Sequence, residues 1–331
     1  MRQTAVLRIL AALVIFGSGA TAADPQLMSM VMPDAKILAG VNTGSTRISP
    51  FGQFIIAKVA TLGVGPQKFI TATGFDPLQD VSEVLAATTA DVSRRGGLLL
   101  ARGNFNVDKI VAAAAGYPNV QVQSYGGATL LSFTNPKTNS LQALAFIGNS
   151  VAVSGDLATV EAAVTRNGAP IAIDPALIAQ VSQLSSTEDE WLVSSVSVAS
   201  LFPWFGASSA PALQALLMLR NIQSFNGGVN FAANVQLDAQ ALTSDAQNAT
   251  ALAAVLKLGV TLASSLAGNN AQFRELTRFL QTLQVTASGS AVNLSLAIPE
   301  TQVEALLNQV LKPPTPAVRA QLRSHRLPNG N

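Results

Sequence analysis

The sequence contains no cysteine and a single histidine, His325, which lies close to the C-terminus. The lack of cysteine excludes disulfides, thiol nucleophiles and cysteine-ligated zinc sites. Because no histidine precedes the C-terminal segment, a Ser–His–Asp triad has no base in the body of the chain. The glycine-rich phosphate loops G-x-G-x-x-G and G-x-x-x-x-G-K-[ST] are also absent. We therefore predict a non-enzymatic protein with no catalytic, cofactor-binding or metal-binding residues. The routes left to a hydrolase are a carboxylate pair or a Ser–Lys pair.

Aromatic residues and charge are scarce as well. Aromatic residues make up 5% of the chain while hydrophobic residues make up 49%, which predicts a core of small aliphatic side chains. The formal net charge of +2 comes from the two ends, because Arg2 and Arg8 precede the body and four basic residues lie within the last twenty positions. The body between them has 14 basic and 18 acidic residues. A net-acidic body without a basic stripe excludes nucleic acid as a partner.

The first 22 residues have the pattern of a cleavable export signal. Arg2 and Arg8 flank the start of a short apolar run at 9–16, which Gly17 and Gly19 end. Small residues at Ala20 and Ala22 then predict cleavage after Ala22 and a periplasmic or extracellular location. The alternative, an uncleaved membrane anchor, needs about 20 apolar residues in a row. This run is shorter, and we expect no integral membrane span here or later in the chain.

Helix starts are marked by capping residues. Three Asp-Pro pairs place an N-cap carboxylate before a proline at the first helical position, at Asp24-Pro25, Asp76-Pro77 and Asp174-Pro175. Apolar spacing extends the second of these helices to Leu85. Further helices are expected after Asn106, after Asp156, after Ser244 (a capping box with Gln247), near 273–283 and near 303–310.

Glycine pairs and other turn residues mark the hairpins. Turns are expected at Gly126-Gly127, Gly148-Asn149, Gly227-Gly228 and Ser288-Gly289-Ser290. The first two belong to a four-strand antiparallel meander over 120–153. Further strands are expected at 98–101, as a buried central strand, and at 191–198.

These elements predict an α+β fold with antiparallel sheets and helices on one face. Similar element orders in 97–165 and 229–311 indicate an internal duplication and two similar ferredoxin-like lobes. The expected organisation is a signal peptide at 1–22, lobes at 23–168 and 169–312, and a disordered tail containing proline and arginine at 313–331.

Acidic residues gather in two places. Asp76, Asp80 and Glu83 lie close together in sequence, and we interpret them as the cap and first turn of a helix, with a metal or acid–base site as the alternative. Glu188, Asp189 and Glu190 are interpreted as a solvated loop. A calcium site there is the alternative, although the spaced ligands of a calcium loop are missing.

Three other groups are candidates for contacts. Met28, Met30 and Met32 are interpreted as core residues, with a Cu(I) site as the alternative. Phe202, Trp204 and Phe205 form either part of the core or an exposed patch for a partner or membrane surface. Arg94 and Arg95 belong to a solvated turn or to an anion site built with the glycines that follow.

Two short segments carry a resemblance. They are Thr73-Gly74-Phe75-Asp76-Pro77 and Ala101-Arg102-Gly103-Asn104-Phe105, preceded by Pro33-Asp34-Ala35. With them, residues 27–311 resemble uncharacterised exported bacterial proteins of unknown function. The resemblance implies export and a single compact body, and it implies no functional residue.

The sequence therefore predicts a binding or scaffold protein of the bacterial cell envelope, with an unknown protein or envelope component as its partner and no cofactor. A histidine-independent hydrolase and a peripheral membrane protein, held by the basic tail and the aromatic segment, are the alternatives.

Overall fold

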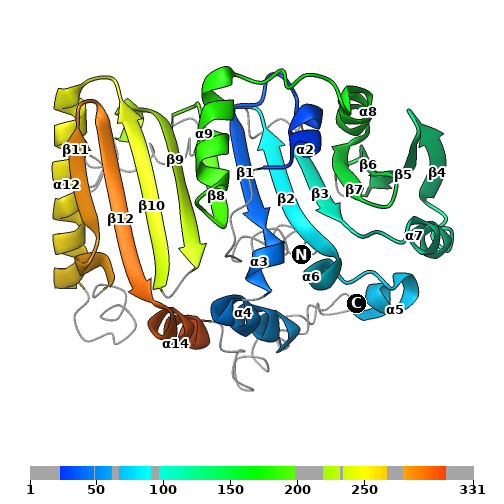
Figure 1. The fold of residues 1–331 in the computed structure, drawn as a ribbon, viewed down its shortest axis with the longest axis horizontal. Helices are drawn as coiled ribbons and strands as arrows, with labels where there is room; N and C mark the ends of the chain where they lie inside the picture. Colours follow the sequence, from blue (N-terminus) through cyan, green and yellow to red (C-terminus); the bar gives the residue numbers. More distant parts are fainter. Residues whose placement is uncertain are drawn as a thin grey trace, which may run out of the picture.

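The protein is described by a computed structural model that covers residues 23–47, 49–61, 67–90, 97–136, 138–197, 219–231, 234–266 and 279–310. Its centre is one twelve-stranded antiparallel sheet, in the spatial order β11-β12-β10-β9-β8-β1-β2-β3-β7-β6-β5-β4 (Figure 1). The strands are β1 (Ile37–Asn42), β2 (Val81–Thr88), β3 (Leu98–Gly103), β4 (Val120–Tyr125), β5 (Ala128–Asn135), β6 (Ser140–Ile147), β7 (Val151–Asp156), β8 (Glu190–Ser194), β9 (Ile222–Phe231), β10 (Asn234–Thr243), β11 (Gln284–Ser288) and β12 (Ala291–Pro299).

Helices surround this sheet. They are α2 (Pro25–Met30), α3 (Thr43–Thr46), α4 (Pro50–Thr61), α5 (Gln67–Thr73), α6 (Pro77–Asp80), α7 (Val107–Ala114), α8 (Leu157–Arg166), α9 (Pro175–Ser185), α12 (Ala246–Leu266) and α14 (Glu300–Val310). The α+β class and the antiparallel pairing predicted from the sequence are confirmed. None of the helices described here is long and apolar enough to cross a membrane.

One continuous sheet joins the two predicted lobes. Strand β8 follows the predicted boundary after residue 168, and it pairs with β1 on one side and with β9 on the other. The strands of the two halves therefore do not form separate sheets. Both ends of the sheet are built alike, because β3 leads through α7 to a meander that returns beside it, and β10 leads through α12 to a hairpin that returns beside it. Internal duplication and independent folding of 23–168 and 169–312 stay predictions.

Helices cover both faces of the sheet, not one face as the sequence suggested. Side chains alternate along each strand, so Leu38 and Leu85 lie on one face, with a core completed by α2, α8 and α9. Val41 and Val84 lie on the opposite face, where α4, α7 and α14 contribute to the core. Helix α12 covers the β10–β12 end of this second face. The central strands are apolar on both sides, so each face needs its own cover.

The Asp-Pro pairs begin helices as predicted. The Asp24 carboxylate accepts hydrogen bonds from the backbone N–H groups of Gln26 and Leu27, at 2.8 and 3.1 Å. Asp76 and Asp174 cap α6 and α9 in the same way. The cap of α12 differs from the prediction by one residue. The Asp245 carboxylate accepts the N–H of Asn248 at 2.8 Å, where Ser244 was expected to be the cap.

The helix predicted from Asp76 to Leu85 is wrong beyond its first turn. Helix α6 ends at Asp80, and Val81–Thr88 forms strand β2. Strand β2 pairs with β1 and β3 in the middle of the sheet, where its β-branched and small side chains pack on both faces. Tertiary pairing thus overrides a helical spacing that extends over only a few turns.

Three of the four predicted hairpins are confirmed, together with the four-strand meander β4–β7. Gly126 and Gly127 both have positive φ, 55° and 82°, which is typical of the two-residue turn that suits strand twist. Gly148 and Gly289 have φ of 56° and 55° in the other two turns. Glycine is favoured at these positions because it has no Cβ to clash.

The turn predicted at Gly227-Gly228 is wrong, because both residues lie inside the continuous strand β9. The reason for glycine here is close packing. A Cβ at Gly228 would lie 2.2 Å from Cγ of Glu188 and 2.8 Å from the carbonyl oxygen of Glu190. A Cβ at Gly227 would lie 2.7 Å from the carbonyl oxygen of Asp238.

Gly228→Ala is therefore expected to destabilise the protein by about 1–3 kcal/mol, the usual range for overpacking a filled site. The free energy of unfolding in urea measures this. Gly259→Ala in α12 is the matched control, because among the described residues nothing apart from its chain neighbours and its own helix backbone lies within 4 Å of its Cβ position. Alanine favours a helix interior over glycine, so the control is expected to be neutral or stabilising. A Gly228→Ala variant as stable as the parent would contradict the packing.

Candidate binding site

The two segments that carry the family resemblance meet in space. Phe75, from the first segment, and Phe105, from the second, have ring centroids 5.2 Å apart. The backbone N–H of Asn104 donates to the carbonyl oxygen of Asp80 at 2.7 Å, which ties the end of α6 to the end of β3. Gly103 makes this approach possible, because a Cβ there would lie 2.4 Å from the same carbonyl oxygen. Two motifs almost thirty residues apart thus form one local structure.

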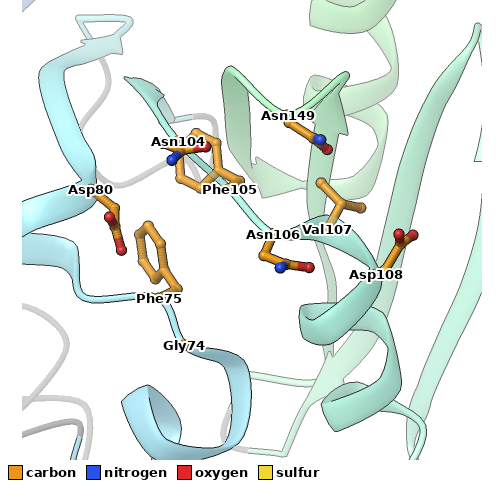
Figure 2. Close-up of a pocket in the computed structure, with 9 residues that line it drawn as sticks. All are labelled: Gly74, Phe75, Asp80, Asn104, Phe105, Asn106, Val107, Asp108 and Asn149. Atoms are coloured by element: carbon orange, nitrogen blue, oxygen red, sulfur yellow. The ribbon is translucent and has the colours of Figure 1, made fainter.

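A pocket opens where these segments meet the β6–β7 turn (Figure 2). Its cavity volume is about 360 Å³. The residues that line it are Gly74, Phe75, Asp80, Asn104, Phe105, Asn106, Val107, Asp108 and Asn149. Figure 2 shows the two phenyl rings facing each other on one side, with Asn149 and Asp108 on the other.

Backbone contacts fix the walls of the pocket. The N–H of Phe105 donates to the carbonyl oxygen of Asn149 at 2.8 Å, which holds the β6–β7 turn against the start of α7. The Asn106 side chain accepts the N–H of Lys109 at 3.1 Å and so caps α7. The Asp80 carboxylate accepts the N–H of Asp76 at 2.7 Å, so it orders the chain around α6.

The accessible surface of the pocket is mostly polar, and buried apolar side chains support it from behind. Phe105 and Val107 are buried, and Phe105 packs further on Phe146 with a centroid distance of 5.5 Å. Asn104 and Asn149 are exposed, and each amide supplies both hydrogen-bond donors and acceptors. Two aspartates add acceptors and negative charge. Among the described residues, the lining has no hydroxyl, amine or imidazole side chain.

The predicted acidic cluster of Asp76, Asp80 and Glu83 is separated by the fold. Asp76 is the helix cap that the sequence indicated, and Asp80 lies at the pocket. Glu83 lies in β2 on the opposite face, beside α2. Burial raises the pKa of Glu83 from 4.5 to about 7, against the lowering effect of the N–H of Asp24, which donates to its carboxylate at 3.0 Å.

Arg102, the arginine of the second motif, holds the N-terminal helix on this other face. Its guanidinium forms a salt bridge of 2.6 Å with Asp24 and donates to the side-chain oxygen of Gln26 at 2.9 Å. The pairing is half-buried, so screening by water limits its strength. The sequence indicated nothing of this role.

The Glu188–Asp189–Glu190 segment is not the solvated loop that the sequence suggested. Asp189 is fully buried and Glu190 is 5% exposed. The Asp189 carboxylate accepts the N–H of Phe231 at 2.7 Å, and the backbone carbonyl oxygen of Asp189 accepts the N–H of Asn42. The segment leads into β8 between two neighbouring strands, which explains its burial. Desolvation raises the pKa of Glu188, and the nearby Asp238 and Asp189 carboxylates raise it further.

The other residues that the sequence singled out lie either in the core or outside the described residues. Met28, Met30 and Met32 are buried in the core with α8 and α9, as the core interpretation requires. Phe202, Trp204 and Phe205 lie outside the described residues, and so do Arg94 and Arg95, the predicted signal peptide and the tail from 313. Within the described part of the chain, no group of three or more His, Cys, Asp or Glu side chains is placed to hold a metal ion.

Comparison with known proteins identifies the fold only. No family model matches the chain, and no curated protein matches it in sequence. A crystal structure of TP0453 (crystal form IV) has a TM-score of 0.52 at 9% identity, with 87% of this chain and 97% of that chain covered. Crystal form I of the same protein has a TM-score of 0.46 at 9% identity, with 88% and 99% covered. The α+β fold therefore has a solved counterpart, and at this identity no function follows from it.

Proposed function

We propose that this chain is a non-enzymatic binding protein of the bacterial cell envelope, and that the pocket between α6, α7 and the β6–β7 turn receives a small, neutral, hydroxyl-rich or amide-containing ligand. The observation that carries the proposal is the convergence of the two motif segments on this pocket. Location in the envelope rests on the predicted export signal.

The chemistry of the lining supports a neutral polar ligand. Exposed amides at Asn104 and Asn149 donate to and accept from hydroxyl or amide groups. The Phe105 ring is buried, so it supports the pocket wall from behind and leaves recognition of the ligand to these polar groups. Asp80 and Asp108 disfavour an anion, because their charge would repel it.

The alternatives find less support at this pocket. A carboxylate-dependent hydrolase would use Asp80 and Asp108, which lie on opposite sides of the pocket (Figure 2). Asp80 also already accepts a backbone N–H. A peripheral membrane protein would depend on the aromatic segment and the tail, which lie outside the described residues.

Ligand-observed NMR on the exported protein tests the proposal, with a panel of neutral mono- and disaccharides and short amides as probes. We expect one class to bind and Asn104→Ala to weaken its binding by about 3–10-fold, the effect of losing one hydrogen bond. Asn149→Ala is expected to act similarly.

Asn119→Ala is the matched control, since Asn119 is an exposed amide beyond the far end of α7 and lies outside the lining. It should bind like the parent. Binding that survives in an Asn104→Ala/Asn149→Ala double variant would refute the assignment of the site. Turnover of a probe during the measurement would refute the non-enzymatic function.

A further inference from the structure

We propose that removal of the first 22 residues completes the fold, because the new α-ammonium of Ala23 pairs with the Glu83 carboxylate and donates to the Ser185 hydroxyl. The step is hydrolysis of the Ala22–Ala23 peptide bond by a leader peptidase. Water adds across the bond, the carboxylate leaves with Ala22, and Ala23 keeps an ammonium group. The inference rests on the predicted cleavage position and is independent of the pocket.

One acceptor already bonds this nitrogen, and a carboxylate bonds the nitrogen that follows it. The backbone N of Ala23 donates to the Ser185 Oγ at 3.0 Å, and that serine is 2% exposed. The next backbone N–H, of Asp24, donates to Glu83 Oε1 at 3.0 Å. Backbone bond lengths keep consecutive nitrogens within about 4 Å, so the Ala23 nitrogen lies within roughly 7 Å of the Glu83 carboxylate.

The position of Ala23 is fixed by the helix that follows it. Asp24 caps α2 and pairs with Arg102, while Leu27 and Met30 are fully buried in the core. Ala23 itself is half-buried and packs against the same core. A terminus held in place by the helix that follows it, and packed on the core, loses little conformational freedom when it forms an ion pair, which favours the contact.

The electrostatics around Glu83 favour an added cation. The described charged groups that act on this carboxylate are Asp24 on α2, which opposes its ionisation, and Arg102 on β3, which favours it. Arg102 is itself bonded to Asp24 and Gln26. Helix α9 contributes the neutral Ser185 hydroxyl. In the unprocessed chain the Ala23 nitrogen is a neutral amide, so only cleavage supplies a second positive charge.

The test uses the full chain, exported and processed by a bacterial host, and compares the parent with Glu83→Gln. Intact-mass measurement is expected to show a mature chain that begins at Ala23. The α-amine is then converted by pyridoxal phosphate-mediated transamination, which requires the uncharged amine. An ion pair that raises the amine pKa by one unit leaves tenfold less of the uncharged form, so the parent should react about tenfold more slowly than Glu83→Gln.

Glu161→Gln on α8 removes a charge without removing a partner of Ala23, and it should react like the parent. If Glu83→Gln does not fold, Ser185→Ala replaces it and should also react faster than the parent. Equal reaction rates in the parent and these variants, or a mature chain that begins at another residue, would overturn the proposal. Neither result bears on ligand binding at the pocket, so the two proposals fail separately.

Discussion

Phe105→Ala is expected to destabilise the protein by about 3–5 kcal/mol, the usual cost of removing a buried phenyl ring from a core. Phe105 is 3% exposed and contacts the rings of both Phe75 and Phe146, at centroid distances of 5.2 and 5.5 Å. Its removal leaves a cavity beside Phe75 and Phe146, and the lost contacts add to the cost of the lost burial. Urea unfolding, monitored by circular dichroism, measures the loss.

The matched control is Phe133→Ala in the neighbouring meander, because Phe133 is 37% exposed. Its effect should be well below that of Phe105→Ala. Phe105→Leu keeps most of the apolar volume and should cost less than about 1.5 kcal/mol. If Phe105→Ala is no more harmful than Phe133→Ala, the aromatic packing of Phe105 described above is wrong.

The full-length chain, with its first 22 residues retained, is expected to lose about 3 kcal/mol of stability between pH 4.5 and pH 7 through Glu83 alone. Below pH 4.5 the carboxyl is protonated in both the folded and the unfolded states. As pH rises, the unfolded state ionises first, because burial holds the folded-state pKa at about 7. The unfolded state is then favoured by about 1.4 kcal/mol for each unit between the two pKa values.

Cell-free synthesis provides this unprocessed chain, and urea unfolding at several pH values gives the slope. Glu83→Gln should remove the loss assigned to Glu83, whereas Glu161→Gln should keep it. The raised pKa values of Glu188 and Glu300 act in the same direction and remain in both variants. A Glu83→Gln variant with the slope of the parent would contradict the burial of this carboxyl.

Local structure was predicted correctly where a residue type favours one backbone conformation for a reason that does not depend on distant parts of the chain. Aspartates before proline begin helices because the carboxylate satisfies free N–H groups in any context. Gly126 and Gly127 turn the chain because their positive φ is unfavourable for other residues. In contrast, Gly228 serves close packing against Glu188, which lies forty residues away in the chain, so the same residue type was misread as a turn.

The sequence predicted only part of the candidate site. Its two motifs were noticed, but Phe75 and Phe105 meet only because β2 pairs with β3 and brings the end of α6 beside the end of β3. The predicted helix to Leu85 concealed this contact, because on a helix Asp80 and Glu83 would be neighbours on the same face, whereas Glu83 lies in a strand. The burial of Asp189 was not predicted either, because an acidic segment in the sequence does not show which strands will pack around it.

The sequence by itself determined the α+β class, the antiparallel meander, the helix caps and a core of small aliphatic residues, since these follow from local backbone preferences and composition. Only the tertiary structure decided that one sheet joins both halves, that helices cover both of its faces, and that the pocket and the Glu83 environment exist. These features depend on pairing between distant strands, whose free energy comes from burying both sheet faces together and is not encoded in any short segment.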